Sequence, residues 1–361
     1  MTTTTPTLGG RPGATAAGTA ADFETTKEVG FYGLVWRRFR QRRVALVAAI
    51  VLCVIAGACI FVPFLLPAEC ADFSQLVNGQ ALGPFTHGVS DGSACPSVPA
   101  GSYFHLLGTD TSGRDLLLRV LDGGRISLLI GVLTMSVTMV IATTLGALSG
   151  FFGGVVDTLV TAVTNAVLAV PSILLLVILV RTFDSSNDLQ IGFTGLLGLP
   201  SSVPILGSPL SPTTSSIFIV VIAISLISWP QTARIIRSVI LSTREKEFIE
   251  AARAVGTPRL RIISRHLIPN ALGPIVVSAS LTVSAAILTE SAISFLGYGI
   301  QEPQPTWGKL LDEGRDALIN SPDTGIWYAF WPGMLILLTV LSFNYIGDAL
   351  RDAFDPRSIE R

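Results

Sequence analysis

The segment that decides how this chain is organised is Arg244–Asn270, REKEFIEAARAVGTPRLRIISRHLIPN, a charged stretch between two strongly apolar segments. Its first half carries apolar or small residues at helical spacing. These are Phe248, Ala251, Ala252 and Val255. The spacing predicts an amphipathic helix, which we expect to end at Gly256.

The second half of this segment has the features of another helix start. Thr257 is a suitable N-cap and Pro258 suits the first helical position, so we expect a helix over residues 259–267 that ends at Pro269. The prediction is a helix, a glycine turn and a helix. On spacing alone, an ordinary charged loop with a helical tendency is the alternative.

The composition around this segment is that of an integral membrane protein. Of 361 residues, 50% are hydrophobic and only 14% are charged, and the mean hydropathy is +0.62. Soluble domains carry about 25% charged residues. The formal net charge of −1 gives no reason to expect a nucleic-acid partner.

Apolar segments long enough to cross a bilayer recur along the chain. They lie at about 44–66, 126–149, 156–180, 216–236, 271–295 and 328–346. The prediction is an all-α polytopic membrane protein with six transmembrane helices. Pro171, Pro230 and Pro332 are expected to kink helices or to end turns.

The remaining segments define the expected domain organisation. Residues 1–28 have no apolar period and are expected to be disordered, and residues 31–43 predict an interfacial helix rich in arginine. These form a tail over 1–43, followed by a first span over 44–66 and an extracytoplasmic segment over 67–124. A transmembrane domain over 125–348 and a tail over 349–361 complete the chain.

Within the extracytoplasmic segment we expect one short amphipathic helix. Ser112 and Asp115 have capping-box spacing, and apolar residues follow on one face before Gly123-Gly124. The prediction is a helix on the outer membrane surface that ends at these two glycines. Its role is either to brace the next span or to contact a partner that delivers solute.

The basic residues predict the orientation. If the N-terminus is inside, eighteen of the 24 Lys and Arg residues lie in inner segments and six in outer ones. Positive charge accumulates on the cytoplasmic side of membrane proteins. Both termini and the 244–270 segment are therefore expected in the cytoplasm.

Glu250-Ala251-Ala252 with Gly256 and Pro269 resembles the EAA loop of the membrane subunits of ABC importers. The residues before the proline, His266-Leu267-Ile268, depart from the usual pattern and are similar to the dipeptide/oligopeptide permease branch. The resemblance implies a type I ABC importer permease fold. It also implies that residues 244–270 dock on a cytoplasmic ATPase.

Further stretches in the same order resemble that branch. They are Leu107–Leu128, with LGTD, GRD and GRISL; Thr289–Gly297, TESAISFLG; Pro305–Gly308, PTWG; and Phe343–Arg357, FNYIGDALRDAFDPR. The resemblance thus covers about residues 107–357. It implies a C-type permease subunit that pairs with a homologous second permease, two ATPases and an extracellular solute-binding protein.

Two further groups of residues are candidates for a role. Cys70 and Cys95 flank a polar outer stretch and are expected to form a disulfide there, whereas Cys53 and Cys59 lie in an apolar segment as small hydrophobic residues. Glu290 is the acidic residue deepest in an apolar segment, so we expect a gate or packing role, with a proton relay as the alternative.

No motif for metal binding, hydrolysis or phosphate binding occurs in the chain. We therefore expect no enzyme activity, no metal and no cofactor in this chain, with ATP bound by the partner subunits. A peptide is the expected solute. The alternatives are the same machinery with another small solute such as a nickel chelate, a secondary transporter, and, more remotely, a membrane-embedded enzyme.

Overall fold

The computed structural model describes residues 31–65, 83–88, 103–110, 113–184, 212–300, 304–320 and 322–354. Most of these residues are helical. The long helices are α2 (Arg43–Leu65), α3 (Leu116–Phe152), α4 (Gly154–Ala169), α5 (Ser172–Asp184), α7 (Pro212–Thr243), α11 (Leu272–Phe295) and α13 (Pro322–Phe354). The shorter ones are α1 (Phe31–Gln41), α8 (Glu247–Ala254), α9 (Arg259–Ile262), the π-helical η1 (Ile263–Leu267), α10 (Ile268–Asn270) and α12 (Trp307–Asn320).

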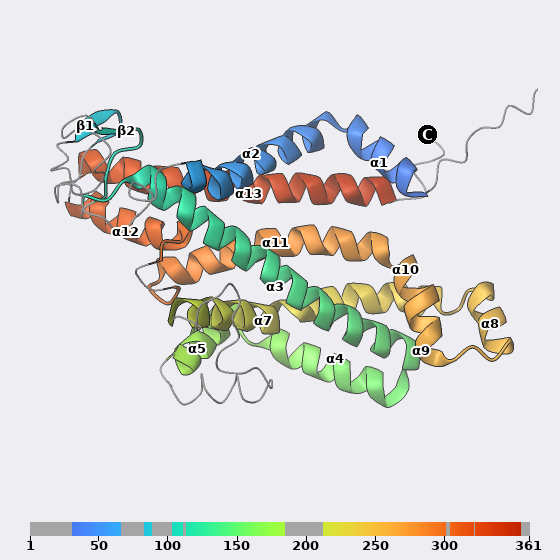
Figure 1. The fold of residues 1–361 in the computed structure, drawn as a ribbon. Coiled ribbons are helices and arrows are strands. Elements are labelled where there is room, and N and C mark those ends of the chain that lie inside the picture. Colours follow the sequence, from blue (N-terminus) through green and yellow to red (C-terminus); the bar gives the residue numbers. More distant parts are fainter. Residues whose placement is uncertain are drawn as a thin grey trace, which may run out of the picture.

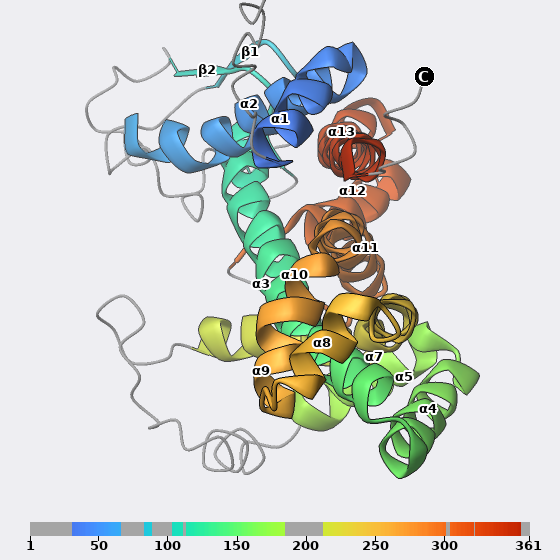
Figure 2. The same ribbon diagram turned by 90° about the vertical axis from the view of Figure 1, so that its right-hand side faces the viewer.

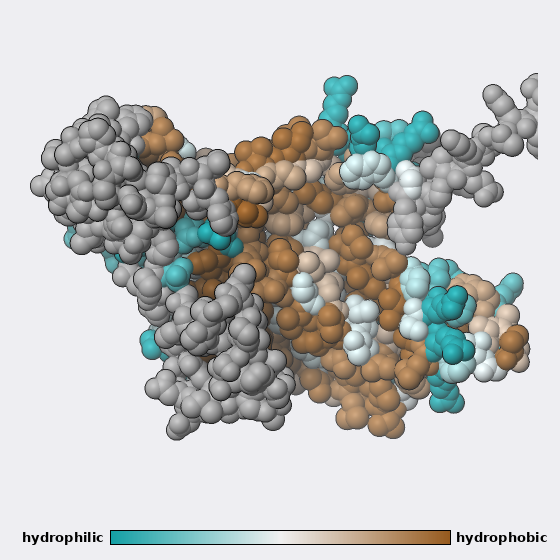
Figure 3. All heavy atoms as spheres, in the orientation of Figure 1, coloured by the Kyte–Doolittle hydropathy of each residue, from teal (hydrophilic) through white to brown (hydrophobic). Residues whose placement is uncertain are grey.

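The expected helical membrane protein is confirmed. Among the described residues, five helices are long and apolar enough to cross a membrane, or six if the bent pair of α4 and α5 is counted as one span. Figure 3 shows hydrophobic side chains over the middle of one face, with hydrophilic side chains gathered over α1 and over α8 and α9. One short antiparallel pair of strands, β1 (Thr86–Gly88) and β2 (Tyr103–His105), adds to the helices.

The third expected span is broken at the first of the three expected prolines. α4 and α5 meet at 92°. Val170, just before Pro171, is extended with φ −90° and ψ 134°, because a proline disfavours the helical conformation of the residue before it. Pro230 and Pro332 lie instead inside α7 and α13, which continue past them.

The expectation of a separate surface helix ending at Gly123-Gly124 is wrong. α3 is one helix of 37 residues, and its N-cap is Asp115, whose carboxylate accepts the backbone N–H of Leu118 at 3.1 Å. A Cβ on Gly124 would lie 2.4 Å from the sulfur of Cys59 and 2.8 Å from the Trp307 ring. The glycine therefore permits close packing, and it does not end the helix.

The bundle has two distinct ends. Figure 1 shows α8 and α9 projecting at one end, which we call the loop end, and α12 with the strands at the opposite end, which we call the strand end. α3 runs obliquely between them. Figure 2 shows α13, α11 and α7 in sequence beside α3, with α4 beyond α7.

Some of the expectations fall outside the described residues. They concern the N-terminal tail to residue 30 and the pairing of Cys70 with Cys95, and they stay predictions. The helix expected on the arginine-rich segment is present as α1, and Arg42 beside it forms an ion pair with Asp352 in α13 at 2.5 Å.

Candidate functional site

The projecting segment at the loop end is a helix, a glycine turn and a second helical stretch. α8 ends at Ala254 with Val255 as its C-cap, and Gly256 follows with φ +78°. The N–H of Gly256 donates to Arg253 O at 2.9 Å, and the N–H of Thr257 donates to Ala252 O at 3.1 Å. These two bonds are those of a Schellman motif, which needs a residue in the left-handed conformation after the helix.

Two details of the second helical stretch differ from expectation. Thr257 is not the N-cap of α9, because its N–H closes the turn of α8; the N-cap is Pro258, which has no side-chain cap bond. Pro269 does not end the stretch either. The wider π turn of η1 precedes it and removes the clash of its ring with the preceding turn, so the chain continues through α10 into α11.

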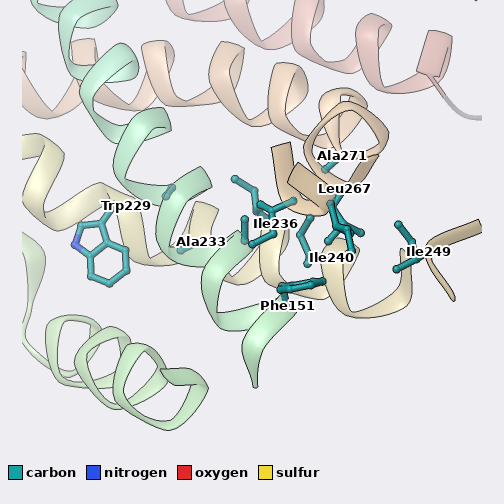
Figure 4. Packing of buried hydrophobic residues seen from close by; sticks show 12 residues of the cluster. Phe151, Trp229, Ala233, Ile236, Ile240, Ile249, Leu267 and Ala271 are labelled. Atoms are coloured by element: carbon teal, nitrogen blue, oxygen red, sulfur yellow. The ribbon is translucent and has the colours of Figure 1, made fainter. Parts of the chain in front are cut away.

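One face of this segment is fixed to the bundle by buried side chains. Ile249 of α8 and Leu267 of η1 are 0% exposed and belong to the same cluster as Phe151 of α3 and Ile240 of α7 (Figure 4). Full burial of one such aliphatic side chain contributes about 1.5–3 kcal/mol. The segment is therefore packed on α3 and α7, and it does not hang from the bundle as a free loop.

Polar contacts tie the same segment to the end of α3. Arg244 donates from Nη1 to the carbonyl oxygen of Gly150 at 2.9 Å. The guanidinium of Arg253 lies 5.4 Å from the centre of the Phe151 ring. α7, α8 and α3 are thus joined at this end by hydrogen bonding and by cation–π contact as well as by packing.

The other face of the segment presents apolar side chains to the outside. Phe248 is 41% exposed, Leu260 is 69% exposed and Val255 is 86% exposed. Glu250 and Ala251 are exposed beside them, and Ala252 is partly buried. Exposed apolar side chains gathered at the tip of an anchored segment are typical of a surface that another protein covers.

The structure brings most of the predicted loop residues together, with one reassignment. Phe248 and Val255 do not form the packed face of the first helix; that role belongs to Ile249, which the sequence reasoning missed. The available signal was the spacing of Ile249 and Ala252, three residues apart, which places them on one face of the helix. Pro269 lies away from the tip, at the junction with α11.

Glu290 lies at a different place, within the bundle. Its carboxylate is 0% exposed and accepts hydrogen bonds from Ser294 at 2.8 Å and from Ser127 of α3 at 3.3 Å. The Ser127 hydroxyl in turn accepts the backbone N–H of Trp307 at 3.2 Å. Glu290 therefore connects α11, α3 and the start of α12.

A cluster of charged side chains at the strand end was not foreseen from the sequence. The Arg119 side chain, 1% exposed, lies 2.7 Å from Asp110 Oδ2, 2.7 Å from Glu313 Oε2 and 2.7 Å from the Tyr328 hydroxyl. Arg114 pairs with Asp110 at 2.5 Å. The five residues join the start of α3 to α12 and α13, so we call them the strand-end cluster.

Within the strand-end cluster, the environment shifts the acidity of Glu313. Burial acts to raise the pKa of the Glu313 carboxyl, but the hydrogen bonds and positive charge of Arg119 outweigh this effect, and the pKa lies below its usual range. Glu313 is thus held as a carboxylate that pairs with Arg119. Neighbouring Asp115 and His105 form a second pair at 2.8 Å.

Among the described residues, no group of three or more His, Cys, Asp and Glu side chains is placed to hold a metal ion. A bundle of apolar spans, with a packed segment that projects at one end and shows apolar side chains, defines a polytopic membrane protein built to work with a partner. Comparison with known proteins identifies the family.

The chain belongs to the family described as binding-protein-dependent transport system inner membrane component, whose model matches residues 142–360. Residues 30–81 match the N-terminal TM domain of oligopeptide transport permease C. The chain is therefore the membrane permease component of an ABC transport system, and its family is one of transporters, not of enzymes.

Named relatives support the same assignment. The chain is 39% identical to the oligopeptide transport system permease protein OppC of Haemophilus influenzae, over 76% of this chain and 77% of the relative. It is 38% identical to the dipeptide transport system permease protein DppC of Alkalihalophilus pseudofirmus, over 70% and 72%. It is 32% identical to the glutathione transport system permease protein GsiD of Pectobacterium atrosepticum, over 89% and 90%.

Proposed function

We propose that this chain is a permease subunit through which peptides are imported across the cytoplasmic membrane. The support is the substrate in the names of the relatives: oligopeptides, dipeptides and glutathione, which is itself a tripeptide. A nickel chelate, the alternative solute considered from the sequence, appears in none of those three names. A peptide is thus the solute class that the relatives favour.

In this proposal the loop end faces the cytoplasm and docks on an ATPase. The observation that carries it is the two-sided segment formed by α8, Gly256 and α9. Ile249 and Leu267 fix its inner face to the bundle, while Phe248, Val255 and Leu260 leave apolar surface at its tip. A partner that binds the tip and moves would therefore move α3 and α7 as well.

The remaining partners complete the transport cycle. The proposal requires three kinds of partner: a homologous second permease, two ATPase subunits that bind ATP, and an extracellular solute-binding protein. In this proposal the chain itself binds no nucleotide. Both termini are cytoplasmic. Closing and opening of the ATPases would rock the helices between outward-facing and inward-facing states.

The test is a charge placed at the tip. Val255→Asp should weaken copurification of the ATPase by about tenfold or more, because apolar anchors at the centre of an interface carry much of its binding energy. Ile319→Asp, at a side chain that is 74% exposed on α12 at the strand end, is the matched control and should leave copurification unchanged. Equal ATPase yield from wild type and Val255→Asp, with both inserted normally, would refute docking at this tip.

A further inference from the structure

A pocket of about 340 Å³ lies between α4 and α7, away from the loop tip and from the strand-end cluster. α4 contributes Thr161, Thr164 and Asn165 to its wall, and α7 contributes Arg234 and Arg237. The α4 residues are spaced three and four apart, so they form one polar stripe along the helix. The pocket thus places polar side chains, two arginines among them, between α7 and the first half of the bent pair of α4 and α5, although apolar residues such as Val160 and Ala233 also line it.

The two arginines of the pocket differ in their partners. Arg237 forms two bonds to Asp157, with Nε to Oδ1 at 2.5 Å and Nη2 to Oδ2 at 2.6 Å. Arg234 donates from Nη2 to Oδ1 of Asn165 at 2.6 Å, which is a neutral acceptor. No carboxylate in the described part of the chain pairs with Arg234, so the pocket carries one uncompensated positive charge.

The position of Arg234 along the bundle makes this charge costly in contact with lipid. It lies nine residues before the end of α7, which corresponds to about 13 Å. On neighbouring α4, Val155 and Leu159 lie nearer the loop end and are 76% and 61% exposed. Exposed apolar side chains thus lie on the loop-end side of Arg234, which is itself exposed within the apolar helix α7, and an exposed guanidinium at such a depth must meet water or protein.

The break between α4 and α5 supports the same conclusion. Non-helical backbone at membrane depth is tolerated only where protein covers it or where it lines a water-filled cavity. Pro171, six residues beyond Asn165, makes such a break. The polar stripe of α4 leads from Asp157 near its start towards this break, as expected for the wall of an aqueous path.

We propose that Arg234 lies in the wall of the solute path and binds the carboxylate of a peptide in transit, an inference that rests on the proposed function. A guanidinium pairs with a carboxylate through two parallel N–H donors, and the bond to Asn165 occupies only one N–H of Arg234. A free peptide carries a C-terminal carboxylate at neutral pH. Arg237 is not available for this role because Asp157 already pairs with it.

The test compares a peptide with its C-terminal amide. Wild type and Arg234→Gln are reconstituted with the second permease, the ATPases and the binding protein, and uptake of both peptides is measured. For each peptide, uptake by the variant is divided by uptake by wild type. This ratio cancels any preference of the binding protein for one of the two peptides. We expect uptake of the acid to fall about tenfold or more and uptake of the amide to be nearly unchanged, since a hydrogen bond between charged groups is lost only for the acid.

Two further variants sharpen this comparison. Arg234→Lys keeps the positive charge but lacks the planar pair of N–H donors, so its uptake of the acid should fall less than that of Arg234→Gln. Arg315→Gln removes an exposed charge on α12 at the strand end and should leave both ratios at one. An equal fall for acid and amide would show that Arg234 contacts a protein carboxylate, such as one of the second permease, and would overturn the proposal, as would no fall at all.

A second readout does not depend on transport of the amide. A peptide with a photoreactive C-terminal residue should label α4 or α7 next to Arg234, and the label should be lost in Arg234→Gln. Labelling only elsewhere in the complex would also overturn the proposal. Failure of the wild-type complex to import any peptide would instead overturn the proposed function, so the two failures are distinguishable.

Discussion

Thr257 donates its backbone N–H to the carbonyl oxygen of Ala252 at 3.1 Å, and this bond closes the last turn of α8 across Gly256. The geometry depends on φ +78° at Gly256, although a Cβ there would meet no atom within 4 Å. The constraint at residue 256 is therefore one of backbone conformation, not of space.

Gly256→Val should abolish coupling without unfolding the protein. A β-branched residue strongly disfavours positive φ, so the turn should open and α8 should lose its position relative to α9. Gly256→Asn is the matched variant, because asparagine tolerates the left-handed conformation, and it should keep most activity. Solute uptake and ATPase copurification, measured at equal membrane levels, check both. If Gly256→Val takes up solute at the wild-type rate, this segment is not a coupling element.

Glu250→Ala should give a milder defect than Gly256→Val. Glu250 is exposed on α8, and losing one exposed charge costs little compared with displacing the whole helix. Uptake is expected to remain within about fivefold of wild type, as a loss below about 1 kcal/mol implies. A defect as complete as that of Gly256→Val would assign Glu250 a direct contact of its own.

The orientation predicts which cysteines are labelled from outside. In a variant whose four native cysteines are replaced by serine, Ser264→Cys at the loop end should react with an impermeant maleimide only after permeabilisation. Asp316→Cys on α12 should react in intact cells, and both positions are exposed. Labelling of Ser264→Cys in intact cells would invert the topology.

Glu290 is expected to act in packing. Glu290→Gln keeps an oxygen that accepts the Ser294 hydroxyl and should leave uptake within about threefold of wild type, while Glu290→Leu leaves buried hydroxyls without an acceptor and should lower membrane levels sharply. Uptake and thermal stability of the purified protein check this. Loss of uptake in Glu290→Gln at unchanged stability would instead indicate a gate or a proton relay.

Acid should weaken the strand-end cluster through Glu313. The pKa of Glu313 is lower in the folded protein than in the unfolded chain, so its contribution to stability is complete above the unfolded value of about 4.5 and is lost as pH falls through the folded value. The thermal midpoint of wild type should therefore fall as pH is lowered below about 4.5. Glu313→Gln should flatten that fall, whereas Asp316→Asn, at an exposed carboxylate on the same helix, should not.

The sequence predicted those features that depend on local chemistry. Periodic apolar residues predicted the membrane-spanning helices and α8, and Pro171 was expected, like Pro230 and Pro332, to kink a helix or to end a turn. Gly256 was expected to end a helix, and its positive φ confirms that expectation. In each case the information lies within a few residues of the feature itself.

Features that depend on distant residues were missed. Gly123-Gly124 has the composition of a helix end, but Cys59 and Trp307 pack against Gly124 and the helix continues. The ion pair of Arg119 with Glu313 joins residues 194 apart, and no spacing rule connects them. Such contacts follow from how the helices pack against one another. The residues that meet have no fixed separation in the sequence, so a single sequence does not reveal them.

The continuity of α3 has a mechanical consequence. With 37 residues it extends for about 55 Å, from the Asp115 cap beside the strand-end cluster to Phe151 beneath α8. Because α3 is continuous over this length, a tilt of about 5° about one of its ends would displace the other end by about 5 Å. A displacement at one membrane surface would thus be transmitted to the other surface through one continuous helix.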